Sequence, residues 1–278
     1  MRLAALVLVP ALVLAGCSSG AEDDGRTEVA AAAYPLAWLA SQVAGADAEV
    51  LDLVDPGVEP HDVELTPRQV ADLREADLVV HLKGFQPAVD DALDDTPALD
   101  LALLQDKGSE DPHIWLDPLR MRAAAIAMTD RLVEVDPDHA DGYRTRGKAL
   151  VAQLAQLDAT FRSSLQRCAR KEVVTSHAAF GYLAARYGLV QRGISGLSPD
   201  AEPSPADLAD VVRFAREHRV TTIFFETLVD PAVARTVADE VGARTAVLDP
   251  VESVRDGDDY LSVMRRNAAA LHDALGCA

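Results

Sequence analysis

The thirty residues 137–166, PDHADGYRTRGKALVAQLAQLDATFRSSLQ, predict one long helix that decides how the chain is organised. Apolar side chains recur through this stretch at helical spacing, namely Tyr143, Leu150, Leu154, Leu157, Phe161 and Leu165. Thirty helical residues would extend about 45 Å, enough to run along two domains and to limit hinge motion between them. We therefore expect a linking helix at residues 137–167, with one domain on either side of it.

Short apolar runs alternate with longer amphipathic ones on both sides of this helix. Such alternation is typical of parallel α/β structure. The expected strands are residues 29–34, 50–54, 78–82 and 101–104 before the helix, and 173–176, 189–194, 221–225 and 245–248 after it. The predicted fold class is α/β, with two lobes at residues 28–136 and 168–278. Each lobe is expected to hold a small parallel sheet flanked by helices, and one long rigid helix joins them.

Five helix starts are predicted from capping residues. A side chain that can accept a hydrogen bond stands directly before proline, and proline suits the first helical position. The pairs are Thr66-Pro67, Asp117-Pro118, Asp136-Pro137, Ser204-Pro205 and Asp230-Pro231.

The N-terminus is apolar through Leu14 and continues Leu14-Ala15-Gly16-Cys17, which resembles a bacterial lipoprotein signal. This resemblance implies that residues 1–16 are removed as a signal peptide and that Cys17 carries lipid, with residues 17–27 as a flexible tether. A retained membrane-spanning helix is the weaker alternative, because the run is shorter than the ~20 residues that a span requires. We expect a lipid-anchored protein at the outer face of the cytoplasmic membrane.

Two cysteines, Cys168 and Cys277, remain once Cys17 is set aside. An even pair in an oxidising compartment favours a disulfide, with two buried free thiols as the alternative. The formal charge of −19 disfavours nucleic acid and anionic lipid as partners, but it can attract cations.

Three histidines and two acidic residues, His61, His113, His177, Glu226 and Asp249, are spread along the chain beyond expected strands. The carboxyl ends of parallel strands open into the crevice where ligands bind, so these side chains can converge. Imidazole nitrogen with a carboxylate oxygen suits a first-row divalent metal ion. From the residues alone, either Glu226 or Asp249 could cap a helix or bind metal.

Each histidine also has a plainer interpretation. A lone loop histidine such as His61 is more often simply solvated. His113 either points to water from a turn whose Trp115 fills the core, or lies in a fixed ligand loop braced by Trp115. The remaining histidines stand at positions where no metal role is expected, namely His81, His139, His218 and His272.

Four strings occur along the chain in a characteristic order: Glu59-Pro60-His61, residues 111–118 (DPHIWLDP), residues 176–183 (SHAAFGYL) and Leu248-Asp249-Pro250. With these strings the chain resembles the solute-binding lipoproteins of zinc and manganese uptake ABC transporters, the ZnuA-like family. The resemblance implies a metal site made by His61, His113, His177 and Asp249, with Glu226 beside it. It also implies two lobes with metal between them, a membrane permease as partner, and a monomer.

Zinc is the expected cargo. In this family, histidine at the third ligand position, here His177, goes with zinc, and glutamate goes with manganese. Three imidazoles and one carboxylate also suit tetrahedral zinc, whereas manganese prefers more oxygen. Many zinc-uptake members carry a long histidine-rich loop before the second ligand, but here residues 105–111 are short and contain no histidine. Manganese or iron therefore stays an alternative cargo.

An enzyme is not expected. A metallohydrolase keeps an open coordination position, which four protein ligands would fill. A binder of an organic solute or siderophore would need an aromatic or polar pocket, which the 5% aromatic content supports little. A surface adhesin is a further alternative that the sequence leaves open.

Overall fold

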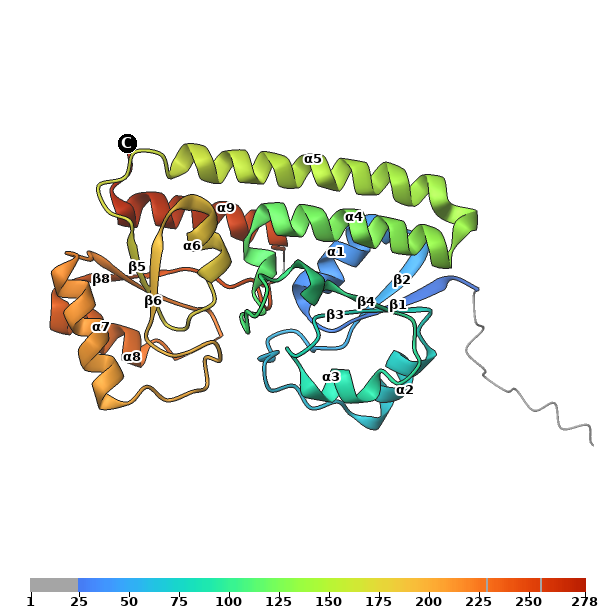
Figure 1. The fold of residues 1–278 in the computed structure, drawn as a ribbon, viewed down its shortest axis with the longest axis horizontal. Coiled ribbons are helices and arrows are strands. Elements are labelled where there is room, and N and C mark those ends of the chain that lie inside the picture. Colours follow the sequence, from blue (N-terminus) through green and yellow to red (C-terminus); the bar gives the residue numbers. More distant parts are fainter. Residues whose placement is uncertain (1–24, 229, 256) are drawn as a thin grey trace, which may run out of the picture.

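The computed structural model describes residues 25–228, 230–255 and 257–278, and it shows two α/β lobes beneath a layer of long helices (Figure 1). Each lobe holds a four-stranded sheet in which all neighbouring strands pair parallel. The first sheet has the order β2-β1-β3-β4 and consists of β1 (Thr27–Ala31), β2 (Ala48–Asp52), β3 (Leu78–His81) and β4 (Ala98–Asp100). The second has the order β6-β5-β7-β8 and consists of β5 (Glu172–Thr175), β6 (Val190–Gly193), β7 (Thr222–Phe225) and β8 (Arg244–Val247). The expected fold class is confirmed.

One expected strand is wrong. Residues 101–104 form the short 3-10 helix η1 (Leu101–Leu104), and strand β4 lies directly before it. The Asp100 side chain accepts a hydrogen bond from the Ala102 backbone N–H at 2.8 Å, which ends the strand and starts the turn. Leu101 is fully buried but Leu103 is 67% exposed, so the apolar run marked the core only in part and did not show the backbone conformation.

The helix starts follow most of the capping predictions. The helices are α1 (Tyr34–Ala44), α2 (Pro67–Glu75), α3 (Pro87–Ala92), α4 (Pro118–Val135), α5 (Ala140–Ser164), α6 (Gly181–Tyr187), α7 (Pro205–Glu217), α8 (Ala232–Val241) and α9 (Tyr260–Leu275). Thr66 and Ser204 form complete capping boxes, and Asp117 caps α4. Pro137 instead begins the 3-10 helix η3 (Pro137–His139), and α8 begins one residue after Pro231.

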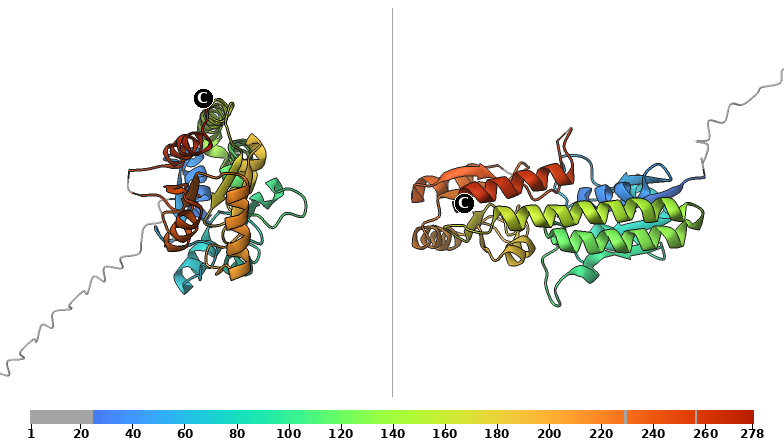
Figure 2. Two further views of the ribbon diagram at one scale, coloured as in Figure 1. Left: turned by 90° about the vertical axis from the view of Figure 1, so that its left-hand side faces the viewer. Right: turned by 90° about the horizontal axis from the view of Figure 1, so that it is seen from above.

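Helix α5 runs along both lobes, as the pattern of residues 137–166 predicts (Figures 1 and 2). Its 25 residues are fewer than the expected thirty, because residues 137–139 belong to η3 and the helix ends at Ser164. It packs closely on α4, and Gly147 is the reason that the two helices can approach. A Cβ atom there would lie 2.0 Å from Oγ1 of Thr129, so a larger side chain would push α4 away.

The main hydrophobic core crosses from one lobe to the other. It includes β1 and β3 of the first lobe, the inner faces of α4 and α5, and α6 and α9 of the second lobe. Trp38 of α1 stacks on Tyr260 of α9 with ring centroids 4.6 Å apart, and the Tyr260 hydroxyl donates to the Trp115 carbonyl at 2.6 Å. A smaller core lies among β5, β7, α7 and α8. The lobes are thus joined by buried packing as well as by α5.

Cys168 and Cys277 form the predicted disulfide, which joins the segment after α5 to the end of the chain. The expected signal peptide at residues 1–16 and the lipidation site Cys17 lie outside the described residues. Within residues 25–278, apart from the two omitted positions, no helix has both the length and the apolar character needed to cross a membrane.

Candidate metal centre

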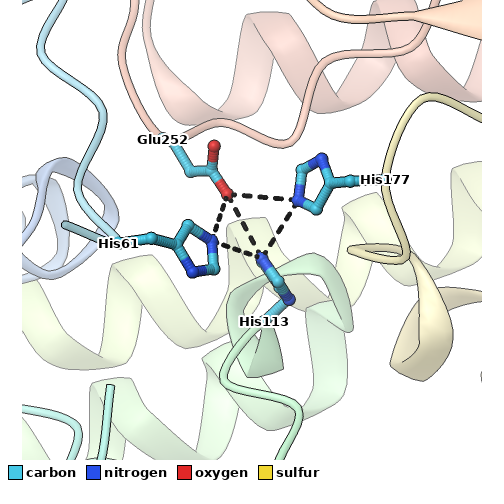
Figure 3. A group of neighbouring side chains, drawn as sticks. All are labelled: His61, His113, His177 and Glu252. Atoms are coloured by element: carbon cyan, nitrogen blue, oxygen red, sulfur yellow. Dashed lines mark hydrogen bonds and ion pairs between the residues drawn. The ribbon is translucent and has the colours of Figure 1, made fainter. Parts of the chain in front are cut away.

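Three of the predicted residues, His61, His113 and His177, meet between the lobes, and Glu252 joins them (Figure 3). His61 lies in the loop from β2 to α2, and His113 directly precedes the 3-10 helix η2 (Ile114–Leu116) before α4. His177 follows β5, and Glu252 lies in the segment between β8 and α9. Two side chains therefore come from each lobe, and one ligand atom of each lies within 4.8 Å of the others.

Five of the six separations among the four ligand atoms are close to those of a regular tetrahedron. Nε2 of His113 lies 3.2 Å from Nε2 of His61 and 3.3 Å from Nε2 of His177. Oε1 of Glu252 lies 3.4, 3.2 and 3.7 Å from Nε2 of His61, His113 and His177. Four ligands about 2.0–2.1 Å from a central zinc ion would be about 3.3–3.4 Å apart at tetrahedral angles. The measured separations fit such an ion.

Two of the histidines are oriented by carboxylates. Nδ1 of His113 lies 2.7 Å from Oδ1 of Asp111, and Nδ1 of His177 lies 2.6 Å from Oε1 of Glu226. A proton on Nδ1 that is shared with a carboxylate leaves the Nε2 lone pair free to face the centre. Glu226 also accepts from the His177 backbone N–H at 3.2 Å and from the Ser176 hydroxyl. Both histidines are fully buried, so their rings have little freedom to turn.

The structure does not bring Asp249 into this group. Oδ1 of Asp249 accepts from the Val251 backbone N–H at 2.8 Å, and Oδ2 accepts from the Thr227 hydroxyl at 3.1 Å. Its carboxylate is therefore occupied by the turn that follows β8. In the group that the structure brings together, the carboxylate is that of Glu252. Sequence reasoning missed Glu252 because it stands beyond that turn and in none of the four family strings.

Charge is concentrated on the buried cluster. Burial lowers the pKa of His113, but hydrogen bonds to Asp111 and Glu252 outweigh it and raise the pKa to about 9. Burial also acts to raise the pKa of Glu252, but hydrogen bonds to His113 and His61 hold it well below its usual range. For Glu59, burial and the nearby Glu252 raise the pKa to about 7. Without metal, Glu252 is thus an anion beside a protonated His113.

Trp115 packs against the centre from the core side, in line with one of the two interpretations that the sequence allowed. Its ring is fully buried and lies 5.2 Å from the His113 ring between centroids. Its indole Nε1 donates to the Pro250 carbonyl at 2.7 Å, which links the His113 segment to the Glu252 segment.

The His61 loop is held by Phe85 and Gln86, which are adjacent to each other in the sequence. Gln86 is almost fully buried, and its amide donates to the Pro60 carbonyl at 3.0 Å and to the Ala32 carbonyl at 2.8 Å. The rings of Phe85 and His61 make an edge-to-face contact, with their centroids 4.9 Å apart. Sequence reasoning did not identify Gln86, since no pattern marks an amide that binds backbone carbonyls.

The other histidines serve local contacts away from the metal centre. Nδ1 of His81 lies 3.3 Å from Asp90, and Nδ1 of His139 lies 2.7 Å from Asp136. His218 lies 3.6 Å from Glu172, and His272 bonds to the Ser164 carbonyl at 2.8 Å.

Comparison with known proteins connects this geometry to a family. A family model described as "Zinc-uptake complex component A periplasmic" matches residues 29–274. The chain belongs to this ZnuA-like family. It is 33% identical over 303 residues to the high-affinity zinc uptake system protein ZnuA of Bacillus subtilis (strain 168), with 98% of this chain and 95% of that protein covered. The family resemblance seen in the sequence is confirmed.

A second relative is longer than this chain. The zinc-binding lipoprotein AdcA of Streptococcus pneumoniae (strain ATCC BAA-255 / R6) is 35% identical over 291 residues, which cover 94% of this chain and 58% of AdcA. The crystal structure of the Zn(II)-bound ZnuA-like domain of S. pneumoniae AdcA superposes with a TM-score of 0.78 at 35% identity. It covers 90% of this chain and 99% of that one. The two-lobed fold with a long helix is that of the ZnuA-like family.

Family membership also decides between the classes of protein that the sequence allowed. The family and these relatives are described by zinc uptake and zinc binding, and none of the descriptions names an enzyme. The prediction that the chain is not an enzyme is therefore confirmed, and the metallohydrolase alternative is excluded.

Proposed function

We propose that this protein is the extracytoplasmic component of an ABC importer that captures zinc between its lobes. Nε2 of His61, His113 and His177 and one carboxylate oxygen of Glu252 bind the ion. The observation that carries this proposal is the convergence of these four atoms, five of whose separations are 3.2–3.7 Å, because tetrahedral zinc in proteins spaces its ligands in this way.

The same spacing favours zinc over the alternative cargoes. Manganese and iron prefer more oxygen ligands and a higher coordination number. Here three donors are imidazole nitrogens, and two of the histidines are fully buried, which limits the approach of additional water ligands. Zinc-binding relatives support the same choice.

Delivery to a membrane permease is the second part of the proposal. Because two ligands come from each lobe, bound zinc bridges the lobes and stabilises one arrangement of their facing surfaces. A permease that recognises this arrangement would discriminate loaded from empty protein. We propose that the chain acts as a monomer, anchored by lipid on Cys17 at the outer face of the cytoplasmic membrane, as the lipoprotein AdcA suggests by its name.

Metal analysis of the soluble chain beginning at Ser18 tests the proposal. We expect one zinc ion per chain, and competitive titration should place zinc above manganese and iron(II). His113→Ala should abolish tight binding, whereas the matched change His218→Ala should leave it intact because His218 faces Glu172 at the surface. Retention of manganese or iron instead of zinc, or equal effects of the two variants, would contradict it.

A further inference from the structure

The segment from Asp249 to Glu252 contains an unusual backbone conformation. Val251 has φ +61°, in the left-handed region that a β-branched residue rarely adopts. Its side chain is fully buried, so the residue stays in this conformation inside the core. Strained backbone of this kind persists only where surrounding contacts hold it, and it commonly occurs at binding sites. Here it directly precedes a candidate ligand, Glu252.

Hydrogen bonds from three directions hold this turn. Asp249 accepts from the Val251 N–H at 2.8 Å. Asn267 of α9 donates to the Asp249 carbonyl at 2.7 Å and accepts from the Asp249 N–H at 3.0 Å. Trp115, from the other lobe, donates to the Pro250 carbonyl at 2.7 Å. Asn267 and Trp115 are both buried, so these bonds are shielded from water.

The turn directly precedes Glu252, whose carboxylate faces the histidines through one oxygen. Oε1 lies 3.2–3.7 Å from all three Nε2 atoms. Oε2 points away from them (Figure 3), and among the described residues it has no hydrogen-bond partner although it is buried. A carboxylate that was free to turn could present both oxygens and would suit an ion with five or six ligands.

We propose that Asp249, Asn267 and Trp115 are positioning residues that set metal specificity by fixing Glu252 as a donor of one oxygen. The turn thereby favours a four-coordinate ion, zinc, over ions that require more ligands. This inference rests on the proposed function, because it concerns the same site and the same cargo.

The two tryptophans of the chain provide a matched test. Trp115→Phe keeps an aromatic ring in the core but removes the donor to Pro250. Trp38→Phe is the control, because Trp38 is also buried but its Nε1 has no hydrogen-bond partner among the described residues. Asn267→Leu removes both bonds to Asp249 at similar volume and gives a second, independent variant.

The measurement is the ratio of the manganese and zinc dissociation constants, together with the visible absorption of the cobalt(II) form, which is intense only for tetrahedral cobalt. We expect Trp115→Phe to reduce the preference for zinc about tenfold and to weaken the tetrahedral cobalt spectrum. Trp38→Phe should change neither. Asn267→Leu should act in the same direction as Trp115→Phe.

Three outcomes would overturn the inference. An unchanged manganese-to-zinc ratio in Trp115→Phe, with or without a general loss of affinity, would show that the turn supports folding and does not set specificity. An equal change of the ratio in Trp38→Phe would show that any core substitution has this effect. If the unaltered chain bound no zinc, the proposed function itself would fail, and this result is distinguishable because it appears before any substitution is made.

Discussion

His113 and His177 are fully buried and each shares its Nδ1 with a carboxylate, whereas His61 lies in a loop with 9% of its side chain exposed. Among the described residues, no carboxylate bonds to Nδ1 of His61. Its loop is held instead through the amide of Gln86 and the ring of Phe85. The inner two histidines are thus arranged before metal arrives, but His61 has a weaker support. We infer that His61 is the ligand that attaches last and leaves first.

Removal of a histidine ligand should give the largest loss of zinc affinity. The loss should differ between the buried histidines and His61. Structural zinc binding by four ligands is worth roughly 10–16 kcal/mol, so one ligand accounts for about 3 kcal/mol, or roughly a hundredfold in affinity. We expect His177→Ala to lose at least this much. His61→Ala should lose less, because water can occupy its more exposed position. Competitive titration with a zinc chelator measures both, and a larger loss in His61→Ala would contradict the comparison.

Neutralising a carboxylate beside an inner histidine should have the next largest effect. Glu226→Gln keeps the shape but removes the charge that orients Nδ1 of His177. Such changes typically lower metal affinity ten- to hundredfold. The matched control is Glu172→Gln, because Glu172 faces the surface residue His218. If both variants bound zinc as the unaltered chain does, Glu226 would have no role in orienting His177.

The pH dependence follows from the pKa of His113, which its neighbours raise to about 9. Zinc must displace the proton that this imidazole holds below pH 9, so affinity should fall about tenfold per pH unit there. Calorimetry in buffers with different protonation enthalpies should detect about one proton released per zinc at pH 7. Release of no proton would contradict a protonated His113 in the metal-free protein.

The stability of the metal-free protein should show the opposite pH trend. A pKa that is raised in the folded state above its unfolded value near ~6.5 adds stability below that value, and this stability is lost as pH rises through about 9. The melting temperature of the metal-free protein should therefore fall between about pH 6.5 and 9, while the affinity for zinc increases.

The smallest effect should come from loosening the His61 loop. Gln86→Met removes two donors to backbone carbonyls and should raise the zinc dissociation rate roughly fivefold. Gln191→Met is the matched change on the inner side, since Gln191 donates to the His177 carbonyl at 3.1 Å. Because Glu226 also holds His177, we expect a smaller change there. Equal zinc dissociation rates in the two variants would contradict the weaker support of His61 compared with His177.

Much of the fold could be predicted from local chemistry. The alternation of apolar runs located the strands, and Thr66, Asp117 and Ser204 marked helix starts because capping is decided by neighbours in sequence. The strand expected at residues 101–104 was wrong because one hydrogen bond from Asp100 turned the backbone there. Periodicity shows which side chains are buried, but it cannot show such a turn.

The position of His177 was predictable from the fold, because it stands two residues after β5, at the sheet edge that opens to the crevice. His61 and His113 lie farther from the strands before them, and the family motifs marked them. Glu252 lies beyond the left-handed Val251, and only tertiary contacts from Asn267 and Trp115 make that backbone possible. The Asp249 prediction came from the family resemblance and from its position at the end of an expected strand. Gln86 was missed for a similar reason, since its partners are backbone atoms distant in sequence.

The buried core that crosses the lobes has a consequence for how the chain unfolds. Neither lobe can detach without exposing Trp38, Tyr260 and the inner face of α5 to water. Two sheets therefore do not make two independent melting units, and the lobes should lose their structure together in one cooperative transition. An ion bound by the four proposed ligands would then stabilise all of this core at once, including residues far from the metal.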